Sequence, residues 1–270
     1  MILLTKDRAM LGYELLSAYP DIACFVTTRK GGCSTGEYGT FNCSPFTGDD
    51  AGNVRRNQDI LCRSLPVRPH ELIIPYQIHG TEVRIINTDF LAADAVHRSD
   101  LLNGVDAVVT QERGCCVCVS TADCIPILLY DRRNEVVAAV HAGWRGTVKG
   151  IVAHTLRVMK DTFGTVGAEV LACLGPGISL ASFEVGEEVY ESFRSEGYCM
   201  ESISRWNEET SKYHIDLSEA NRIQIQAFGV PREQIQIAGI CTYIQHKEFF
   251  SARRLGIKSG RILSGIMLNK

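Results

Sequence analysis

Residues Cys115 to Gly146 read CCVCVSTADCIPILLYDRRNEVVAAVHAGWRG, and this stretch decides the fold. It contains three short apolar runs, at Cys116–Val119, Ile125–Tyr130 and Val136–Val140. Apolar runs of this length, rich in β-branched residues and bounded by turn residues, are typical of buried strands. Cys124 precedes the second run and His141 follows the third. The pattern therefore predicts buried strands that deliver Cys124 and His141 to one end of a sheet.

Composition predicts an ordinary soluble globular protein. The chain has 270 residues, of which 45% are hydrophobic and 22% charged, enough for a substantial core. A formal net charge of -3 gives no reason to expect nucleic acid as a partner. No window approaches the length of a membrane span. We expect a protein that binds neither nucleic acid nor membranes.

The cysteines predict a reducing compartment. There are 11 of them, without framework spacing, and the first residues form no signal peptide. We therefore expect a cytoplasmic protein with free thiols. Cys115, Cys116 and Cys118 lie inside a strand-like run, where small buried thiols pack as hydrophobes, so we assign them no metal.

Strand-like and helix-like patterns alternate along the whole chain. Strands are expected at Ile22–Thr28, Leu72–Ile78, Glu82–Ile86, Asp106–Thr110, Glu169–Leu174, Ile235–Ile240 and Ile262–Leu268. Helices are expected at Asn53–Leu65, Thr147–Phe163, Glu187–Ser195 and Ser218–Phe228. The polar stretches Asp89–Asn103 and Ser204–Lys212 are expected to be loops. Because no repeats or linkers appear, the pattern predicts one α/β (α+β) domain spanning residues 1–270.

A third candidate ligand joins Cys124 and His141. His79, in Gln77-Ile78-His79-Gly80, ends another apolar stretch. One Cys and two His suit zinc, and three protein ligands leave a fourth position for water, which is typical of a catalytic site. Asp123 could orient a ligand or accept a proton. The three ligands are far apart in sequence, so a buried thiol with satisfied core histidines is the alternative interpretation.

Arg29 is a candidate anion ligand. It follows the strand expected at Ile22–Thr28 and precedes Gly31-Gly32, and a guanidinium binds phosphate or carboxylate in bidentate fashion. The sequence leaves a plain surface role for Arg29 equally open.

Several short motifs occur together in one order. They are Gln77-Ile78-His79-Gly80, Thr121-Ala122-Asp123-Cys124, His141-Ala142-Gly143-Trp144-Arg145-Gly146, Leu174-Gly175-Pro176, and Phe249-Phe250-Ser251 with Arg253-Arg254. With them, nearly the whole chain resembles the YfiH-type laccase-domain family, also called polyphenol oxidase or purine nucleoside phosphorylase. The resemblance implies a four-layer α/β/β/α sandwich with mixed sheets and a zinc site at His79, Cys124 and His141.

The resemblance also implies an activity. It implies phosphorolysis of adenosine, inosine, guanosine and methylthioadenosine, together with deamination of adenosine. On this basis we expect purine nucleosides and phosphate as ligands of a monomer. Arg29, Arg145 and the start of the helix near Thr147 could hold phosphate. Asp123 could move protons during deamination.

The chain departs from the family's pattern at two places. The family commonly shows Asn-Arg in its early helix, where this chain has Asn57-Gln58, so a phosphate-binding arginine is either missing or replaced by Arg55 or Arg56. A Tyr or His and an acidic residue often flank the Arg pair, where this chain has Ala252 and Leu255. These departures bear on substrate preference.

Two other activities use the same residues. A copper-dependent polyphenol oxidase, or laccase, needs many imidazoles, often in His-x-His pairs, and this chain has 7 histidines without such a pair, which disfavours copper. A cysteine hydrolase acting on peptidoglycan precursors would use Cys124 as nucleophile and His141 as base. Metal analysis separates the first from a zinc enzyme, and labelling of Cys124 that chelators do not affect would favour the second.

Overall fold

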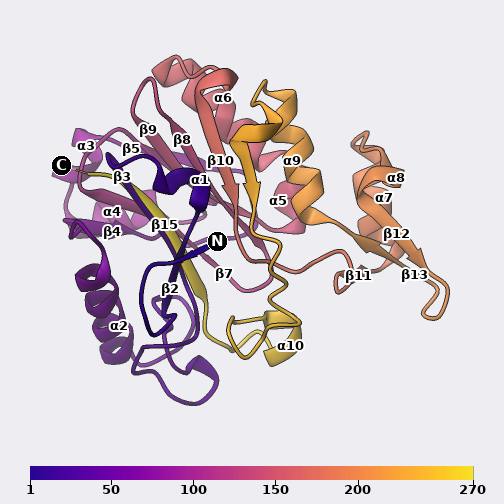
Figure 1. Ribbon diagram of the computed structural model, residues 1–270, viewed down its shortest axis with the longest axis horizontal. Helices are drawn as coiled ribbons and strands as arrows, with labels where there is room; N and C mark the ends of the chain where they lie inside the picture. The colour runs from indigo at the N-terminus through magenta and orange to yellow at the C-terminus, as the bar shows by residue number, and fades with distance from the viewer. Residues whose placement is uncertain (270) are drawn as a thin grey trace.

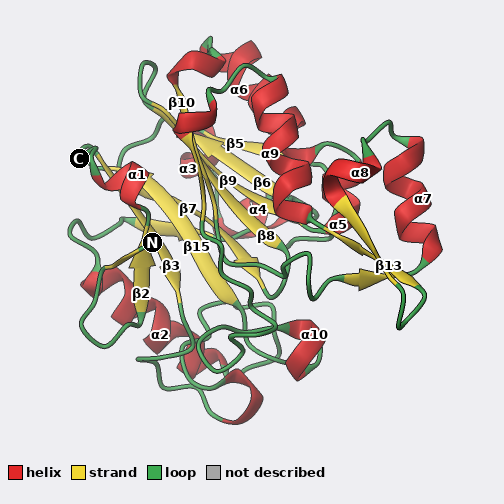
Figure 2. Ribbon diagram, turned by 45° about the vertical axis from the view of Figure 1, so that its right-hand side comes forward, coloured by secondary structure: helices red, strands yellow, loops and turns green. Residues whose placement is uncertain are grey.

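The structure is a computed structural model, and it describes residues 1–269. Its centre is two six-stranded sheets (Figures 1 and 2). The first has the order β1 (Ile2–Leu3), β2 (Met10–Gly12), β3 (Ile22–Thr27), β15 (Ile262–Leu268), β7 (Cys115–Thr121) and β4 (Glu71–Ile73). The second has the order β14 (Ile235–Ile237), β10 (Val170–Leu174), β8 (Ile125–Asp131), β9 (Val136–Ala142), β6 (Ala107–Thr110) and β5 (Val83–Ile86).

Both sheets are mixed. Their central pairs are antiparallel, whereas β4 runs parallel to β7 in the first sheet. In the second sheet, β14 runs parallel to β10 and β5 runs parallel to β6. The α/β class with mixed sheets that the sequence predicts is confirmed.

The quoted stretch is divided between the two sheets. β7 lies in the first sheet, whereas β8 and β9 form an antiparallel hairpin in the second. The prediction that buried strands deliver Cys124 and His141 to one end of a sheet is confirmed for β8 and β9, whereas β7 lies in the other sheet and Ala122–Cys124 carries the chain across. The hairpin register pairs Ile125 with Ala142 and Pro126 with His141, so Cys124 still comes close to His141.

Three apolar clusters hold the elements together. The middle one joins the two sheets through residues such as Val117, Leu128 and Ile266. Leu129, next to Leu128, faces the opposite way and packs with the helices α6 (Ile151–Phe163) and α9 (Leu217–Ala227), because successive strand residues point to opposite faces. A third cluster packs α2 (Ala51–Ser64) on the outer face of the first sheet.

The helices with strong sequence signals form as expected. α2 begins two residues before the predicted Asn53, and the carboxylate of Asp50 accepts a hydrogen bond from the backbone N–H of Asn53. Asp216 caps α9 in the same way through Glu219. α7 occupies Glu187–Ser195, as predicted.

The helix expected at Thr147–Phe163 is two helices. α5 spans Trp144–Val148, and α6 begins at Ile151. Gly150 separates them with φ +76°, in the left-handed region that glycine adopts without steric cost. The sequence pattern missed the break because the apolar residues on either side of Gly150 keep the spacing of one continuous helix.

Two segments expected to be loops are regular structure. Asp89–Asn103 contains most of α3 (Thr88–Ala92) and all of α4 (Ala95–Leu101), capped by Asn87 and Asp94. Their polar faces are exposed, as His97 is, and only Phe90 is buried, so the helical period is hidden. Ser204–Lys212 contains β12 (Ser204–Asn207) and the start of β13 (Lys212–Ile215).

The hairpin of β12 and β13 belongs to a third, small sheet. It pairs with β11 (Glu184–Val185) and lies beside α7 and α8 (Met200–Ile203), to one side of the two large sheets (Figure 1). β12 has no buried residue and β13 buries only its last two, so the alternation of apolar and polar residues that would reveal the strands is missing.

Two strands are shorter than predicted. β4 ends at Ile73, and the rest of the predicted Leu72–Ile78 strand is a loop that contains Pro75. β14 ends at Ile237, before Gly239, whose φ is +65°. The remaining short elements are α1 (Glu14–Ser17), α10 (Ala252–Leu255) and the 3₁₀ turns η1 (Gly36–Tyr38), η2 (Gly167–Glu169) and η3 (Arg232–Gln234).

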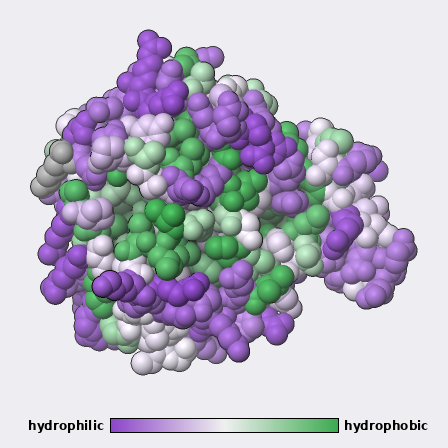
Figure 3. Space-filling view, in the orientation of Figure 1, coloured by the Kyte–Doolittle hydropathy of each residue, from purple (hydrophilic) through white to green (hydrophobic). Residues whose placement is uncertain are grey.

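The face of the molecule seen in Figure 3 is mainly hydrophilic, with an apolar area near its middle. Among residues 1–269, no helix combines the length and the apolarity that crossing a membrane requires.

The break at Gly150 makes a prediction with a definite sign. In a continuous helix, Gly150→Ala would stabilise the protein by about 0.5–1 kcal/mol. At φ +76°, the same change should lower the free energy of unfolding by about 1–2 kcal/mol. Urea unfolding followed by circular dichroism measures the difference. Gly164→Ala, at φ +74° at the end of α6, is the matched control and should be destabilised similarly. A gain in stability at Gly150 would contradict the break.

Candidate metal centre

Two loops and the end of one strand bring the predicted ligands together. His79 lies in the loop that follows β4, Cys124 lies between β7 and β8, and His141 lies near the end of β9. One donor atom from each residue lies within 4.8 Å of the other two, and the two imidazole centroids are 4.7 Å apart. His79 is exposed, Cys124 is half-buried and His141 is buried. The site therefore reaches from the interior to the surface.

Asp106 connects the two histidines, a role that sequence analysis did not predict. Its carboxylate accepts hydrogen bonds from the backbone N–H groups of Ile78, His79 and Gly80, at 3.3, 3.0 and 2.7 Å. The same carboxylate lies 2.7 Å from Nδ1 of His141. One fully buried carboxylate thus fixes the backbone of one ligand loop and the imidazole of the other ligand.

The charge of Asp106 sets the tautomer of His141. Burial opposes ionisation, but the hydrogen bonds from His141 and from the backbone outweigh it and hold the pKa of Asp106 below its usual range. An ionised carboxylate only accepts, so Nδ1–H of His141 donates to it. Nε2 of His141 is then the atom left to bind a metal, an arrangement common among metal-binding histidines.

Gln77 fixes the His79 loop from its other side. Its side-chain amide donates to the backbone carbonyl of Ser120 at 2.9 Å and accepts from the backbone N–H of Ser120 at 2.7 Å. Ser120 lies on β7, shortly before Cys124. The Gln77 side chain therefore ties the His79 loop to the strand that leads to the thiol.

The thiol of Cys124 is acidic in this setting. Burial alone would raise its pKa, but the charge of His141 and hydrogen bonds with His141 and His79 outweigh it and lower the pKa to about 6. Burial lowers the pKa of His141, whereas Cys124 and Asp106 favour its cationic form and raise the pKa to about 9. Cys124 is therefore available as a thiolate, the form that binds metals and attacks electrophiles.

The three side chains face a cavity of about 290 Å³. Gly143, just after β9, lies against them: a Cβ at this position would come 2.7 Å from the His79 ring and 3.1 Å from Sγ of Cys124. No other residue fits there without moving the ligands. The first glycine of the Gly143-Trp144-Arg145-Gly146 motif is therefore required because a side chain there would collide with His79 and Cys124.

Arg261 is the guanidinium that lines this cavity, and sequence reasoning missed it. It donates to the backbone carbonyls of Ile257, Ser259 and Gly260 at 2.9, 2.5 and 3.0 Å. Burial lowers its pKa, against the opposing effect of Cys124 and Asp123. Its only sequence signal is its place immediately before β15, which by itself is typical of many surface arginines.

Asp123 lies next to Cys124 but is engaged elsewhere. Its carboxylate accepts from the Thr242 hydroxyl and from the backbone N–H of Arg253, both at 2.7 Å. It is not among the residues that line the metal cavity. These contacts favour a role in fixing the backbone beside Cys124. Its predicted acid–base role stays a prediction.

The two arginines singled out from the sequence lie outside the lining of the metal cavity. Arg29 donates to the backbone carbonyls of Gly39 and His246, at 3.1 and 2.6 Å, and lies over the Phe250 ring. Arg145 is exposed and lies over the Trp144 ring, 4.3 Å from its centroid. Their role as phosphate ligands stays a prediction. Of the three arginines, Arg261 is the one that lines the metal cavity.

The departures from the family pattern fall in different places. Gln58 donates to the backbone carbonyl of Cys43 at 2.8 Å, and the neighbouring Arg55 and Arg56 are exposed on α2. Ala252 lines the metal cavity, where a larger ring would take up space. Leu255 ends the short α10 and is not among the lining residues.

Comparisons with known proteins place the chain. A family model described as multi-copper polyphenol oxidoreductase laccase matches residues 23–269. The chain is 59% identical over 270 residues to a purine nucleoside phosphorylase of Bacteroides thetaiotaomicron, covering 100% of both. It is 40% identical over 245 residues to adenosine deaminase RL5 from an unknown prokaryotic organism, covering 91% of this chain and 93% of that protein.

Solved structures agree with the fold. YlmD from Geobacillus stearothermophilus superimposes with a TM-score of 0.88 at 29% identity, covering 100% of this chain and 99% of that one. The hypothetical protein YfiH of Bacillus licheniformis gives a TM-score of 0.87 at 26% identity, covering 97% of each chain.

The acidity of Cys124 can be measured in metal-free protein. Alkylation of Cys124 by iodoacetamide, followed by mass spectrometry of its peptide, should accelerate as the pH rises through about 6. An unperturbed thiol would do so near 8.5. His141→Ala removes the neighbouring cation and should move the midpoint upward. A midpoint near 8.5 in the unmodified chain would contradict the electrostatic account.

Asp106→Asn tests the connecting carboxylate. The change preserves size but removes the charge and one pair of acceptor sites, so both histidines should be held less well. We expect metal affinity to fall by about 10–100-fold, measured by competition with a chromophoric chelator. Asp89→Asn, at an exposed position on α3, is the control and should leave affinity unchanged. A dissociation constant for Asp106→Asn within twofold of the unmodified protein would contradict this role.

Proposed function

This chain belongs to the family described as multi-copper polyphenol oxidoreductase laccase, and within that family we propose that it is a zinc-dependent purine nucleoside phosphorylase that also deaminates adenosine. The observation that carries the proposal is the cluster of His79, Cys124 and His141 facing a cavity lined by Arg261. Relatives named purine nucleoside phosphorylase and adenosine deaminase support it at 59% and 40% identity. Candidate substrates are adenosine, inosine, guanosine and methylthioadenosine.

The donor set fits zinc. A thiolate and two imidazoles are ligands that zinc accepts together, and the acidic thiol of Cys124 supplies the ionised form. Three donors on one side of a cavity leave an open position toward it. When bound there, zinc would act as a Lewis acid and lower the pKa of a coordinated water or phosphate. His79, Cys124 and His141 would hold the ion, and Asp106 would keep both histidines in place.

Phosphorolysis needs phosphate close to the sugar. An oxygen of phosphate bonds to C1′ of the ribose as the C1′–N9 bond breaks, and the departing base takes up a proton. The guanidinium of Arg261 is the cation in the cavity that can hold the phosphate, and its three backbone acceptors fix its direction. In deamination, water adds to C6 of adenosine and ammonia leaves.

A copper-dependent polyphenol oxidase is the activity that the family's description suggests. In residues 1–269, His79, Cys124 and His141 form the one group of three or more such residues whose donor atoms converge. A multicopper centre requires several clusters of imidazoles. The supply of ligands in this part of the chain therefore favours a single-ion enzyme.

A cysteine hydrolase acting on peptidoglycan precursors is the second candidate, and one observation favours it. Cys124, His141 and Asp106 form a sequence of thiol, imidazole and carboxylate contacts, with the pKa of the thiol lowered to about 6. The same order of groups activates the nucleophile in enzymes that use covalent catalysis. Such an enzyme needs no metal, so chelation separates the two proposals.

The central experiment uses the full chain loaded with zinc. With inosine and phosphate it should form hypoxanthine and ribose 1-phosphate, and with adenosine it should form adenine, or inosine when phosphate is left out. Chromatography identifies each product. Removing the metal with a chelator should lower both rates at least about tenfold, because the ion's charge stabilisation is worth several kcal/mol, and added Zn²⁺ should restore them.

Controls separate the alternatives. Cys124→Ala should lose both nucleoside reactions and most of the bound zinc. Cys199→Ala, at an exposed thiol just before α8, should lose neither. Hydrolysis of a peptidoglycan precursor by metal-free protein, with covalent labelling of Cys124 by that substrate, would support the hydrolase instead. Phenol oxidation by copper-loaded protein, without nucleoside turnover, would support the oxidase.

A further inference from the structure

A second, larger cavity adjoins the metal cavity. It has a volume of about 510 Å³, and Phe46 and Tyr76 line both cavities. Tyr76 lies three residues before His79 and bonds to the chain at the end of α4: its N–H donates to Leu102 at 3.0 Å, and its carbonyl accepts from Gly104 at 2.9 Å. The loop that carries a metal ligand thus also forms the wall between the two spaces.

The metal cavity is small for the reactants. Small-molecule sites usually occupy about 300–1,000 Å³. At about 290 Å³, the metal cavity lies just below that range, and a nucleoside and a phosphate must share it with a metal ion. The adjoining cavity, which shares Phe46 and Tyr76 with it, offers the space into which one part of the nucleoside can extend.

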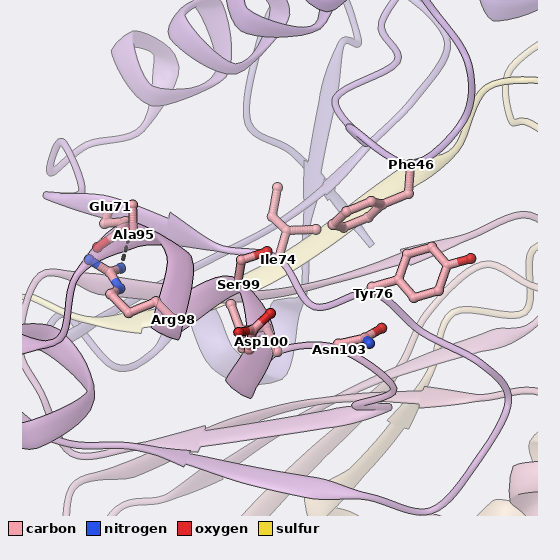
Figure 4. Close-up of a pocket in the computed structure, with 10 residues that line it drawn as sticks. Phe46, Glu71, Ile74, Tyr76, Ala95, Arg98, Ser99, Asp100 and Asn103 are labelled. Carbon is pink, nitrogen blue, oxygen red and sulfur yellow. Dashed lines mark ion pairs between the residues drawn. The ribbon is translucent and has the colours of Figure 1, made fainter.

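The shared wall is aromatic. Phe46 and Tyr76 meet edge to face, with ring centroids 5.2 Å apart. Their exposed fractions are 49% and 46%, so about half of each side chain has no protein partner. Figure 4 shows the two rings together at one end of the adjoining cavity. Exposed aromatic rings at a cavity wall are suited to stacking against a flat ring such as a purine.

The rest of the adjoining cavity suits an uncharged ligand. Arg98, at its other end, is ion-paired with Glu71 (Figure 4). It also lies over the Phe90 ring, 5.0 Å from its centroid. Its charge is therefore already engaged. Asp100 and Asn103 also line the cavity, and Asp100 adds a negative charge that disfavours phosphate. A carboxylate and an amide can instead form hydrogen bonds with the N–H groups and ring nitrogens at the edge of a base.

We propose that the adjoining cavity binds the purine base, stacked on Tyr76 and Phe46, so that the ribose and phosphate lie in the metal cavity. This inference rests on the proposed function and specifies how its substrate lies. Phosphate is directed toward Arg261, the cation of the metal cavity, and away from Asp100. A base placed beyond the aromatic wall leaves C1′ of the ribose on the metal side, the orientation that phosphorolysis uses. Deamination of adenosine uses the other orientation of the nucleoside, in which C6 of the purine faces the metal.

Tyr76→Ala tests the proposal on the zinc-loaded full chain. Loss of one stacking ring should raise KM for inosine about 5- to 100-fold in the phosphorolysis assay. KM for phosphate should change less than twofold, because phosphate lies on the other side of the wall. Tyr76→Phe keeps the ring and should stay near the unmodified protein. Trp206→Ala, at a similarly exposed ring on β12, is the remote control and should change neither constant.

Calorimetric titration with inosine, in the absence of phosphate, separates this inference from the proposed function. Weaker binding of inosine to Tyr76→Ala but not to Tyr76→Phe supports the base site even if the unmodified protein shows no turnover, an outcome that would defeat the proposed function alone. Unchanged affinity and KM for inosine in Tyr76→Ala, or an equal rise in KM for phosphate, would overturn the base site. If the unmodified protein binds no inosine, both proposals fail.

Discussion

The site depends on the buried carboxylate of Asp106. His79 lies in a loop and His141 in strand β9, far away along the chain, and nothing in the local sequence fixes the distance between them. Asp106 accepts from three successive backbone N–H groups around His79 and from the imidazole of His141, at 2.7–3.3 Å. A buried charge is costly without partners, and here every partner is part of the metal site. The folding of the His79 loop and the orientation of His141 are therefore stabilised by the same group.

The division of the quoted stretch between two sheets explains where the site lies. Because β7 and β8 belong to different sheets, the chain must cross from one to the other, and Cys124 lies on that crossing. His141 is the second-last residue of a strand in the second sheet, and Gln77 ties the His79 loop to the first sheet. The ligands thus meet at the edge where the two sheets adjoin. A change in the packing between the sheets would alter the distances between the ligands, so the middle apolar cluster contributes to the site.

The sequence predicted the parts that repeat a local period and missed the parts that depend on distant contacts. β15 and α7 have the predicted bounds because their apolar spacing and flanking residues are sufficient. The exposed helix α4 was missed because it buries too little to show a period. The three candidate metal ligands, whose donor atoms converge, were identified by residue type and by a family resemblance. Asp106 and Arg261 were not, since each looks like an ordinary residue flanking a strand until the fold shows what it contacts.

Two of the five non-glycine residues with positive φ in the described part of the chain lie at the metal site. His79 has φ +64° and Asp123, which precedes Cys124, has φ +88°, a region that costs residues with a Cβ about 1–3 kcal/mol. Each is held there by hydrogen bonds: the N–H of His79 donates to Asp106, and the carboxylate of Asp123 accepts from Thr242 and Arg253. Such a conformation persists only when the surroundings determine it. The surrounding hydrogen bonds stabilise the backbone geometry that brings the imidazole of His79 and the thiol of Cys124 to one point. Relaxing His79 to an ordinary φ would turn its own imidazole away, and relaxing Asp123 would turn the thiol of Cys124 away.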